Sequence, residues 1–237
     1  MPRVLLIHGF ACDSAFWQPQ IPALTAAGYP LWAPDLPFHG GPCAGVDPSL
    51  EGLATWLLRT HLQTPAILIG HSLGGMIALE ILRQAPDKVL AIALVDSFVS
   101  LQLNSLHLPG MFVEGFHAQT RKWIEETRAG IVDRMTQTVY DTIWPSVVGF
   151  DARPWLAGVR CPVLALYAGR GKYAPVDAPL LMGALELDKF AGPARLEIVP
   201  DAGHFVNLER PESVNEILLN WLRQTCALLD QSPQSRA

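Results

Sequence analysis

The fold of this chain is decided by Ala66-Ile67-Leu68-Ile69-Gly70-His71-Ser72-Leu73-Gly74-Gly75. An apolar run typical of a buried strand leads directly into a Gly-x-Ser-x-Gly pattern, and a helix-like segment follows. The two outer glycines leave room for a turn so tight that Ser72 adopts strained backbone angles and projects its hydroxyl above the sheet edge. The N–H of Leu73 would then lie at a helix N-terminus, where developing negative charge is stabilised. The stretch predicts a nucleophilic serine. An ordinary glycine-rich turn with a surface serine is the alternative.

Further strands and helices alternate along the rest of the chain. Helical spacing of apolar residues follows Pro48 and again follows Pro211, where Val214, Ile217 and Leu218 share one face. Alternating elements of this kind predict an α/β fold: a mostly parallel, doubly wound sheet of about six strands with helices on both faces. The predicted strands are Arg3–His8, Tyr29–Pro34, Ala66–Gly70, Val89–Val95, Pro162–Tyr167 and Arg195–Val199.

One interval interrupts the alternation. Residues 101–158 hold no strand candidate but have helical stretches around 114–130 and 132–144. We interpret the interval as a small helical cap inserted into a core formed by residues 1–100 and 159–230, with a polar tail at 231–237. The apolar side chains of the cap either line a pocket over Ser72 or pack the cap onto the core, and the sequence favours neither. They include Leu106, Met111, Phe112, Phe116, Trp123, Tyr140 and Trp144.

Composition limits the classes of function. The chain has 237 residues, with 17 Lys and Arg against 22 Asp and Glu, for a formal net charge of −5. This balance gives no indication of nucleic-acid binding, and no apolar run approaches the roughly 20 residues of a membrane span. The four cysteines are scattered, so neither a metal site nor a disulfide framework is predicted. We expect a soluble cytoplasmic protein with no cofactor. The sequence leaves its oligomeric state open.

A serine hydroxyl needs a neighbouring base to become an effective nucleophile. Of the seven histidines, His204 is the strongest candidate, because it follows the last predicted strand in a loop after Gly203. A loop histidine that merely caps the next helix is the alternative. The segment His8-Gly9-Phe10 suggests a second oxyanion donor, the N–H of Phe10, with His8 holding the loop. His39 is expected to stabilise a turn, and His107 and His117 belong to the cap.

These segments together resemble the α/β-hydrolase family. The similarity rests on Val4 to Phe10, on Ala33 to Gly40, on Gly70 to Gly75, and on Gly203-His204 before Glu209-Arg210-Pro211, which occur in the family's order. The resemblance covers nearly all of the chain except the cap, and the chain begins at what resembles the family's third strand. It implies that Ser72 is the nucleophile, that His204 is the base, and that Phe10 and Leu73 supply the oxyanion hole.

The acid of the triad is where the chain departs from the family. Lys172 stands where the acid is expected, and a lysine cannot accept the imidazole N–H. Asp96 is favoured instead, because it ends the strand beside the Ser72 strand, where some family members have their acid. Asp177 is the rival, although it could equally cap a helix over 178–187. Another residue, or none, is the third possibility.

The predicted function is that of a serine hydrolase acting on a carboxylic ester or related acyl compound with an apolar part. Ser72, His204 and Asp96 would form a covalent acyl-enzyme and transfer the acyl group to water. The same groups support cleavage of lactones, thioesters or carbon–carbon bonds. A barely catalytic ligand-binding protein is a separate hypothesis, for which Lys172 would be a trace of a decayed triad.

Overall fold

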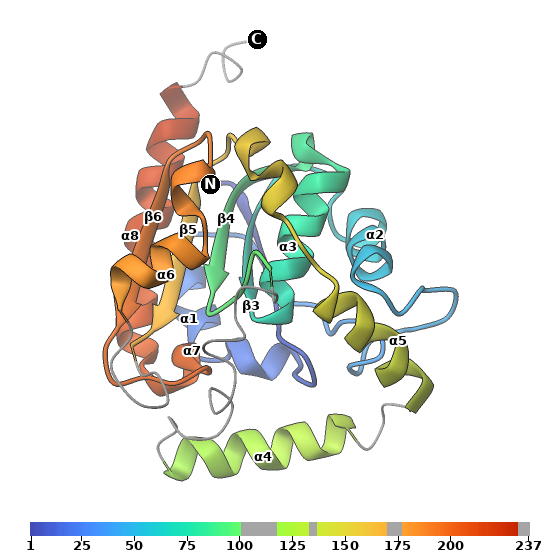
Figure 1. Cartoon of the computed structure of the whole chain (residues 1–237). Coiled ribbons are helices and arrows are strands. Elements are labelled where there is room, and N and C mark those ends of the chain that lie inside the picture. The colour runs from blue at the N-terminus through green and yellow to red at the C-terminus, as the bar shows by residue number, and fades with distance from the viewer. Residues whose placement is uncertain (101–117, 133–136, 170–176, 232–237) are drawn as a thin grey trace.

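The structure is a computed structural model that describes residues 1–100, 118–132, 137–169 and 177–231 (Figure 1). Its centre is a sheet of six strands in the order β2-β1-β3-β4-β5-β6, and every neighbouring pair is parallel. The predicted α/β class and all six strands are therefore confirmed, although β2 is shorter than expected. The strands are β1 (Arg3–Ile7), β2 (Leu31–Trp32), β3 (Ala66–His71), β4 (Val89–Val95), β5 (Val163–Ala168) and β6 (Ala194–Val199).

Helices cover both faces of the sheet (Figure 1). On one face lie α1 (Gln20–Ala26) and α8 (Pro211–Gln231), and on the other lie α2 (Leu50–Thr60) and α3 (Leu73–Gln84). Two buried clusters result, because successive side chains of a strand point to opposite faces. Val4 and Leu6 belong to the cluster under α1 and α8, whereas Leu5 and Ile7 belong to the cluster under α2 and α3. Strands buried on both faces explain the nearly continuous apolar runs of the sequence.

The remaining elements are short, apart from two helices between β4 and β5. These two are α4 (Ala118–Val132) and α5 (Gln137–Val148). The others are α6 (Ala178–Ala184), α7 (Val206–Glu209) and the 3₁₀ turns η1 (Ser14–Trp17), η2 (Pro86–Lys88), η4 (Arg153–Gly158) and η5 (Leu187–Lys189).

The helix that we expected around 132–144 is present as α5, but its ends are shifted. It begins at Gln137 and continues through Pro145 to Val148. Ile143 and Val147 are buried in the cluster under α2 and α3, so tertiary packing favours a helix that extends past the proline. The predicted helix over 178–187, in contrast, ends earlier than expected, at Ala184.

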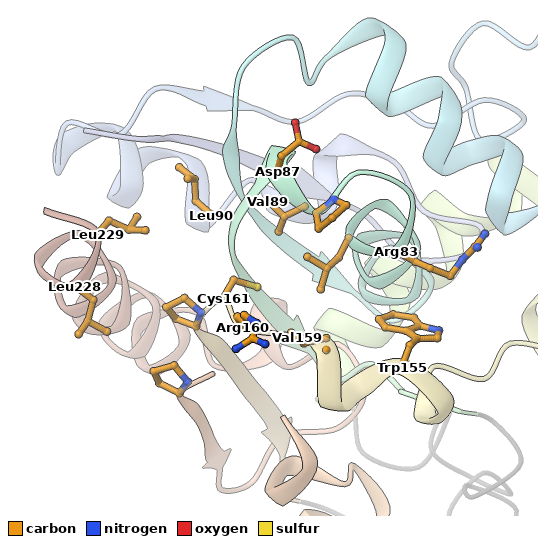
Figure 2. Close-up of a pocket in the computed structure, with 15 residues that line it drawn as sticks. Arg83, Asp87, Val89, Leu90, Trp155, Val159, Arg160, Cys161, Leu228 and Leu229 are labelled. Carbon is orange, nitrogen blue, oxygen red and sulfur yellow. The ribbon is translucent and has the colours of Figure 1, made fainter. Parts of the chain in front are cut away.

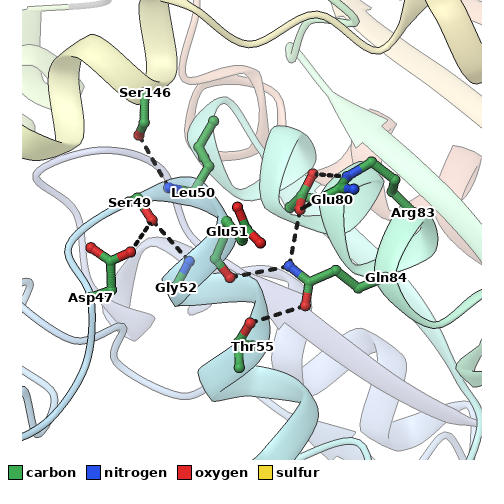
Figure 3. Close-up of polar contacts among 10 residues, drawn as sticks. All are labelled: Asp47, Ser49, Leu50, Glu51, Gly52, Thr55, Glu80, Arg83, Gln84 and Ser146. Atoms are coloured by element: carbon green, nitrogen blue, oxygen red, sulfur yellow. Dashed lines mark hydrogen bonds and ion pairs between the residues drawn. The ribbon is translucent and has the colours of Figure 1, made fainter.

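Polar contacts connect α2 to its neighbours (Figure 3). The hydroxyl oxygen of Ser49 accepts the N–H of Gly52 at 3.0 Å and caps the start of α2. The N–H of Leu50 donates to Ser146 Oγ of α5 at 3.1 Å. Thr55 donates to the side-chain oxygen of Gln84 at 3.0 Å, which joins α2 to α3. These bonds join α5 to α2, and α2 in turn to α3, the helix that follows the serine turn.

No helix in the described part of the chain is both long enough and apolar enough to cross a membrane.

Candidate active site

The candidate site residues come together at the carboxyl edge of the sheet. Phe10 follows β1, Ser72 follows β3, Asp96 follows β4 and His204 follows β6. The carboxyl ends of parallel strands meet at one edge, where open α/β sheets bind ligands. The chain therefore gathers these groups from four separate loops.

Ser72 occupies a strained turn between β3 and α3. Its backbone has φ 52° and ψ −117°, a conformation that L-residues rarely adopt. The turn closes because its glycines lack side chains. A Cβ at Gly70 would overlap the backbone of Gly74, and a Cβ at Gly74 would overlap the carbonyl of Ile7. Strain of this kind costs about 1–3 kcal/mol and persists only where the surrounding structure enforces it.

His204 and Asp96 form a buried hydrogen-bonded pair. The Nδ1–H of His204 donates to Asp96 Oδ2 at 2.7 Å, and the side chains are 2% and 1% exposed. The second oxygen of Asp96 accepts the backbone N–H of Ala168 at 3.1 Å, which orients the carboxylate. The pair joins residues 108 positions apart in the chain. It has the geometry by which a carboxylate holds a catalytic imidazole in one tautomer.

Asp177, the rival acid, is solvent-exposed, whereas His204 and Asp96 are buried. Asp177 immediately precedes α6, and its carbonyl oxygen accepts the N–H of Leu181. This is the helix-capping position that the sequence offered as its alternative role. Lys172 lies outside the described residues. Of the two acids considered, the structure brings Asp96 to His204.

His71 makes a contact that the sequence analysis missed. Its Nε2–H donates to the backbone carbonyl of His204 at 2.9 Å, and the two rings are 4.8 Å apart. His71 is buried, and its Nδ1 has no hydrogen-bond partner. The turn that carries Ser72 is thus bonded directly to the loop that carries His204. No local sequence signal indicates a bond between positions 133 apart.

The His204 loop is held from its other side by α7. The N–H of Gly203 donates to the carboxylate of Glu209 at 3.2 Å, and Glu209 is buried. A hydrogen bond before His204 and another at its carbonyl therefore limit the movement of the imidazole.

The loop after β1 lies beside Ser72. A Cβ at Gly9 would lie 3.3 Å from the Ser72 Cβ and 2.8 Å from His71 Nδ1, so only glycine fits there. In the part of the chain that the structure describes, neither the N–H of Phe10 nor that of Leu73 donates to an acceptor. Unoccupied backbone donors beside a serine are what an oxyanion hole requires.

His8 connects this loop to the next one. The N–H of Leu36 donates to His8 Nε2 at 2.9 Å, so the ring proton is on Nδ1, which donates to the Gly9 carbonyl at 2.9 Å. This is the holding role that the sequence predicted. Burial, reinforced by repulsion from His39, lowers the pKa of His8 to about 3. The Nδ1 of His39 lies 3.0 Å from the carbonyl of Pro37, within the predicted turn.

Burial also decides the ionisation of two neighbours of the site. It holds the pKa of His71 well below its ordinary value, and the charge of a protonated His204 would lower that pKa further. His71 is therefore neutral, which suits a hydrogen-bond donor inside the protein. Burial raises the pKa of Cys12 to about 12, so this thiol near the Phe10 loop does not ionise at neutral pH.

Two aromatic side chains of α5 contact the loop after β1. Tyr140 and Trp144 stack at 6.0 Å, and their rings lie 5.8 Å and 5.6 Å from that of Phe10. They remain 42% and 37% exposed. Trp123 of α4 instead packs against Phe16 at 5.2 Å. Leu106, Met111, Phe112, Phe116, His107 and His117 lie outside the described residues.

A groove of about 850 Å³ lies at the opposite end of the strands (Figure 2). It is lined by the end of α3, by the residues that precede β4 and β5, and by Leu228 and Leu229 of α8. Ser72, His204 and Asp96 are not part of it. Among the described residues, no group of His, Cys, Asp and Glu side chains is arranged to hold a metal ion.

Comparison with known proteins identifies the family of this chain. Residues 4–217 match the model of the alpha/beta hydrolase family. The chain belongs to that family. Its relatives include the pimeloyl-[acyl-carrier protein] methyl ester esterase of Neisseria meningitidis serogroup C, which is 28% identical over 236 residues covering 89% of this chain and 90% of the relative.

Solved structures of other proteins share the fold. A thermophilic esterase from Thermogutta terrifontis has a TM-score of 0.73 at 22% identity, covering 95% of this chain and 90% of its own. An enol-lactonase from Burkholderia xenovorans has a TM-score of 0.68 at 22% identity, covering 94% of this chain and 91% of its own. At these identities the likeness establishes the architecture, and the activity must be argued from the site.

Proposed function

We propose that this protein is a serine hydrolase that cleaves a carboxylic ester or a related acyl substrate. The observation that carries the proposal is the buried 2.7 Å hydrogen bond between His204 and Asp96, at the sheet edge where Ser72 occupies a strained turn. A serine, an imidazole and a carboxylate in that order form a proton relay. The esterase activity named for a relative 28% identical to this chain agrees with the proposal.

In the proposed mechanism, Ser72 attacks the substrate carbonyl while His204 accepts its proton. Because His204 Nδ1 donates to Asp96, the other ring nitrogen, Nε2, acts as the base. The N–H groups of Phe10 and Leu73 stabilise the oxyanion. The protonated His204 then donates its proton to the leaving alcohol, and an acyl-enzyme forms on Ser72. Water activated by His204 releases the acid in the same manner.

The apolar part of the substrate is proposed to contact Phe10, Tyr140 and Trp144. These rings form a partly exposed aromatic group beside one of the proposed oxyanion donors. Aromatic surface next to a polar reaction centre suits an acyl or alcohol chain with apolar character. We further propose that residues 101–158 act as a cap over this edge of the sheet.

A fluorophosphonate probe tests the nucleophile directly. We expect the wild-type protein to be labelled, and we expect Ser72→Ala and His204→Gln to remove the label. Labelling of Ser72→Ala to the wild-type level would contradict the assignment. Absence of labelling in a folded wild-type protein would favour the ligand-binding alternative.

A substrate panel distinguishes the reaction classes that one triad can serve. Turnover of p-nitrophenyl esters, acyl lactones and thioesters is compared under the same conditions, with Ser72→Ala as the blank. We expect the esters to give the highest kcat/KM. A lactone or thioester turned over far faster than every ester would replace the ester assignment while keeping the triad.

A further inference from the structure

Arg128 of α4 lies against the loop that carries His204. Its guanidinium carbon is 5.8 Å from the centre of the Phe205 ring, and that ring is 5.3 Å from the ring of His204. Helix α4 is fixed there by Ile124, which is buried in a cluster with Cys12, Phe16 and Phe205. In Figure 1, α4 crosses below the carboxyl edge of the sheet. The guanidinium of Arg128 therefore lies near the proposed active site.

Arg128 has no counter-ion in the described part of the chain. It makes no hydrogen bond or ion pair there, and its Nε–H is buried without an acceptor. Arg83 and Arg153, in contrast, each have a carboxylate partner at 2.6 Å, Glu80 and Asp151 respectively. A buried N–H without an acceptor costs about 1–3 kcal/mol, which a bound ligand with an acceptor oxygen would recover.

The charge of Arg128 acts on both sides of the site. It contributes to lowering the pKa of His71, which precedes Ser72, and it opposes the upward shift in the pKa of Cys12, which follows the Phe10 loop. Its field thus reaches the serine turn and the loop with the proposed oxyanion donor. A negative group near the reaction centre would lie within this field.

We infer that Arg128 binds a carboxylate of the substrate, so that the preferred ester bears one negative charge. This inference rests on the proposed ester-hydrolase function. The Nε–H and an Nη–H of one guanidinium form a planar fork that matches the two oxygens of a carboxylate. The ring of Phe205 supports the guanidinium from the side of His204.

The test compares matched anionic and neutral esters. One pair carries the charge in the acyl part, mono-p-nitrophenyl adipate against p-nitrophenyl hexanoate. A second pair carries it in the alcohol part, p-butyryloxybenzoate against p-butyryloxybenzamide. The readout is the ratio of kcat/KM for the anionic ester to that for the neutral ester. If an Arg128 variant loses its preference for the anionic ester in one pair only, that pair identifies the part of the substrate that Arg128 binds.

We expect Arg128→Gln to lower this ratio about 10- to 100-fold in one of the pairs, as for a lost charged hydrogen bond. Arg128→Lys keeps the charge without the fork and is expected to lose less. Lys122→Gln is the matched control, because Lys122 is an exposed cation on the same helix, 3.8 Å from Glu126. This control is expected to change the ratio less than about 2-fold.

An unchanged ratio in both substrate pairs for Arg128→Gln would overturn the inference, as would an equal fall in Lys122→Gln. If Arg128→Gln does not fold, wild-type protein at rising salt provides the second measurement. Screening lowers the ratio if a cation of the protein attracts the anion, and a constant ratio would overturn the inference. Absence of turnover for all four esters would instead contradict the proposed function, which separates the two failures.

Discussion

The carboxyl edge of the sheet carries backbone strain and buried polar groups, whereas the amino edge holds a groove without strained residues. Of the six non-glycine residues with positive φ in the described chain, five lie in loops that follow strands, at the carboxyl edge. These five are Ala11, Phe38, Ser72, Asp96 and Asp201. None of the residues that line the groove is among the six.

The groove at the amino edge shows that a large groove need not contain catalytic groups. The groove at the amino edge offers about 850 Å³ of space but none of the proposed catalytic groups. The carboxyl edge contains Ser72, the Asp96–His204 pair and Arg128. Strain at a residue costs free energy, so strained positions persist where function or packing requires them.

Removing the carboxylate of Asp96 is expected to have the largest effect on activity at the carboxyl edge. Asp96→Asn should lower kcat/KM for a p-nitrophenyl ester by about 10⁴-fold, because the amide no longer holds the reactive tautomer of His204. Asp177→Asn, at the exposed position before α6, should change it less than about 2-fold. Similar losses in both variants would remove Asp96 from the proposed triad.

The bond from His71 to the His204 carbonyl should have the next largest effect. His71→Leu removes the donor, and we expect kcat to fall about 100-fold with a smaller change in KM, because the imidazole is held less accurately. His71→Gln places an amide N–H near the position of Nε2 and should restore much of the loss. Equal activity of the Leu and Gln variants would show that the bond does not position His204.

Acid should weaken the fold through the buried histidines. The pKa of His8 is lowered from 6.5 to about 3 in the folded protein, so below about pH 6.5 only the unfolded chain takes up this proton. The contribution of neutral His8 to the free energy of unfolding is therefore complete above about pH 6.5. It is lost as the pH falls toward 3. His8 alone should contribute a loss of about 1.4 kcal/mol between about pH 7.5 and about pH 5.5.

Urea unfolding at the two pH values measures this loss. The variant His8→Asn is expected to be less stable at the higher pH but to lose less stability on acidification. If the free energy of unfolding of His8→Asn falls as steeply with acid as that of the wild type, the acid sensitivity comes from other groups.

Relief of strain is the smallest expected effect. Ser72→Gly should raise the free energy of unfolding by about 1 kcal/mol while abolishing ester hydrolysis, because glycine adopts φ 52° without penalty. Glu186→Gly relieves a similar φ of 48° away from the site, and ester hydrolysis should persist. Thermal unfolding and turnover are measured together. A less stable Ser72→Gly protein would contradict the assignment of strain to the serine turn.

Much of the fold was predictable because its signals are local. Apolar runs of strand length, glycines that permit tight approach, and helical spacing after Pro48 and Pro211 all act within a few residues. The errors were at helix ends. Helix α5 passes through Pro145 because Ile143 and Val147 are buried against the core, and that packing is not visible in the neighbouring sequence.

The candidate site was predictable only in part. The sequence indicated Ser72 from its turn and His204 from its place after the last strand, and it favoured Asp96 while leaving Asp177 open. Its expectations for Phe10 and Leu73 as oxyanion donors stay predictions, now supported by their unused N–H groups. It did not indicate the contacts of His71, Glu209 or Arg128.

The sequence by itself determined the elements, their alternation and the strained serine turn, because these depend on steric and hydrophobic preferences of adjacent residues. Only the tertiary structure decided which carboxylate meets His204, which side chain holds its backbone, and which cation lies beside its loop. Those contacts join positions as far apart as 108 and 133 residues. Distances of a few ångströms between such positions follow from how the sheet orders its strands, and no local pattern contains that order.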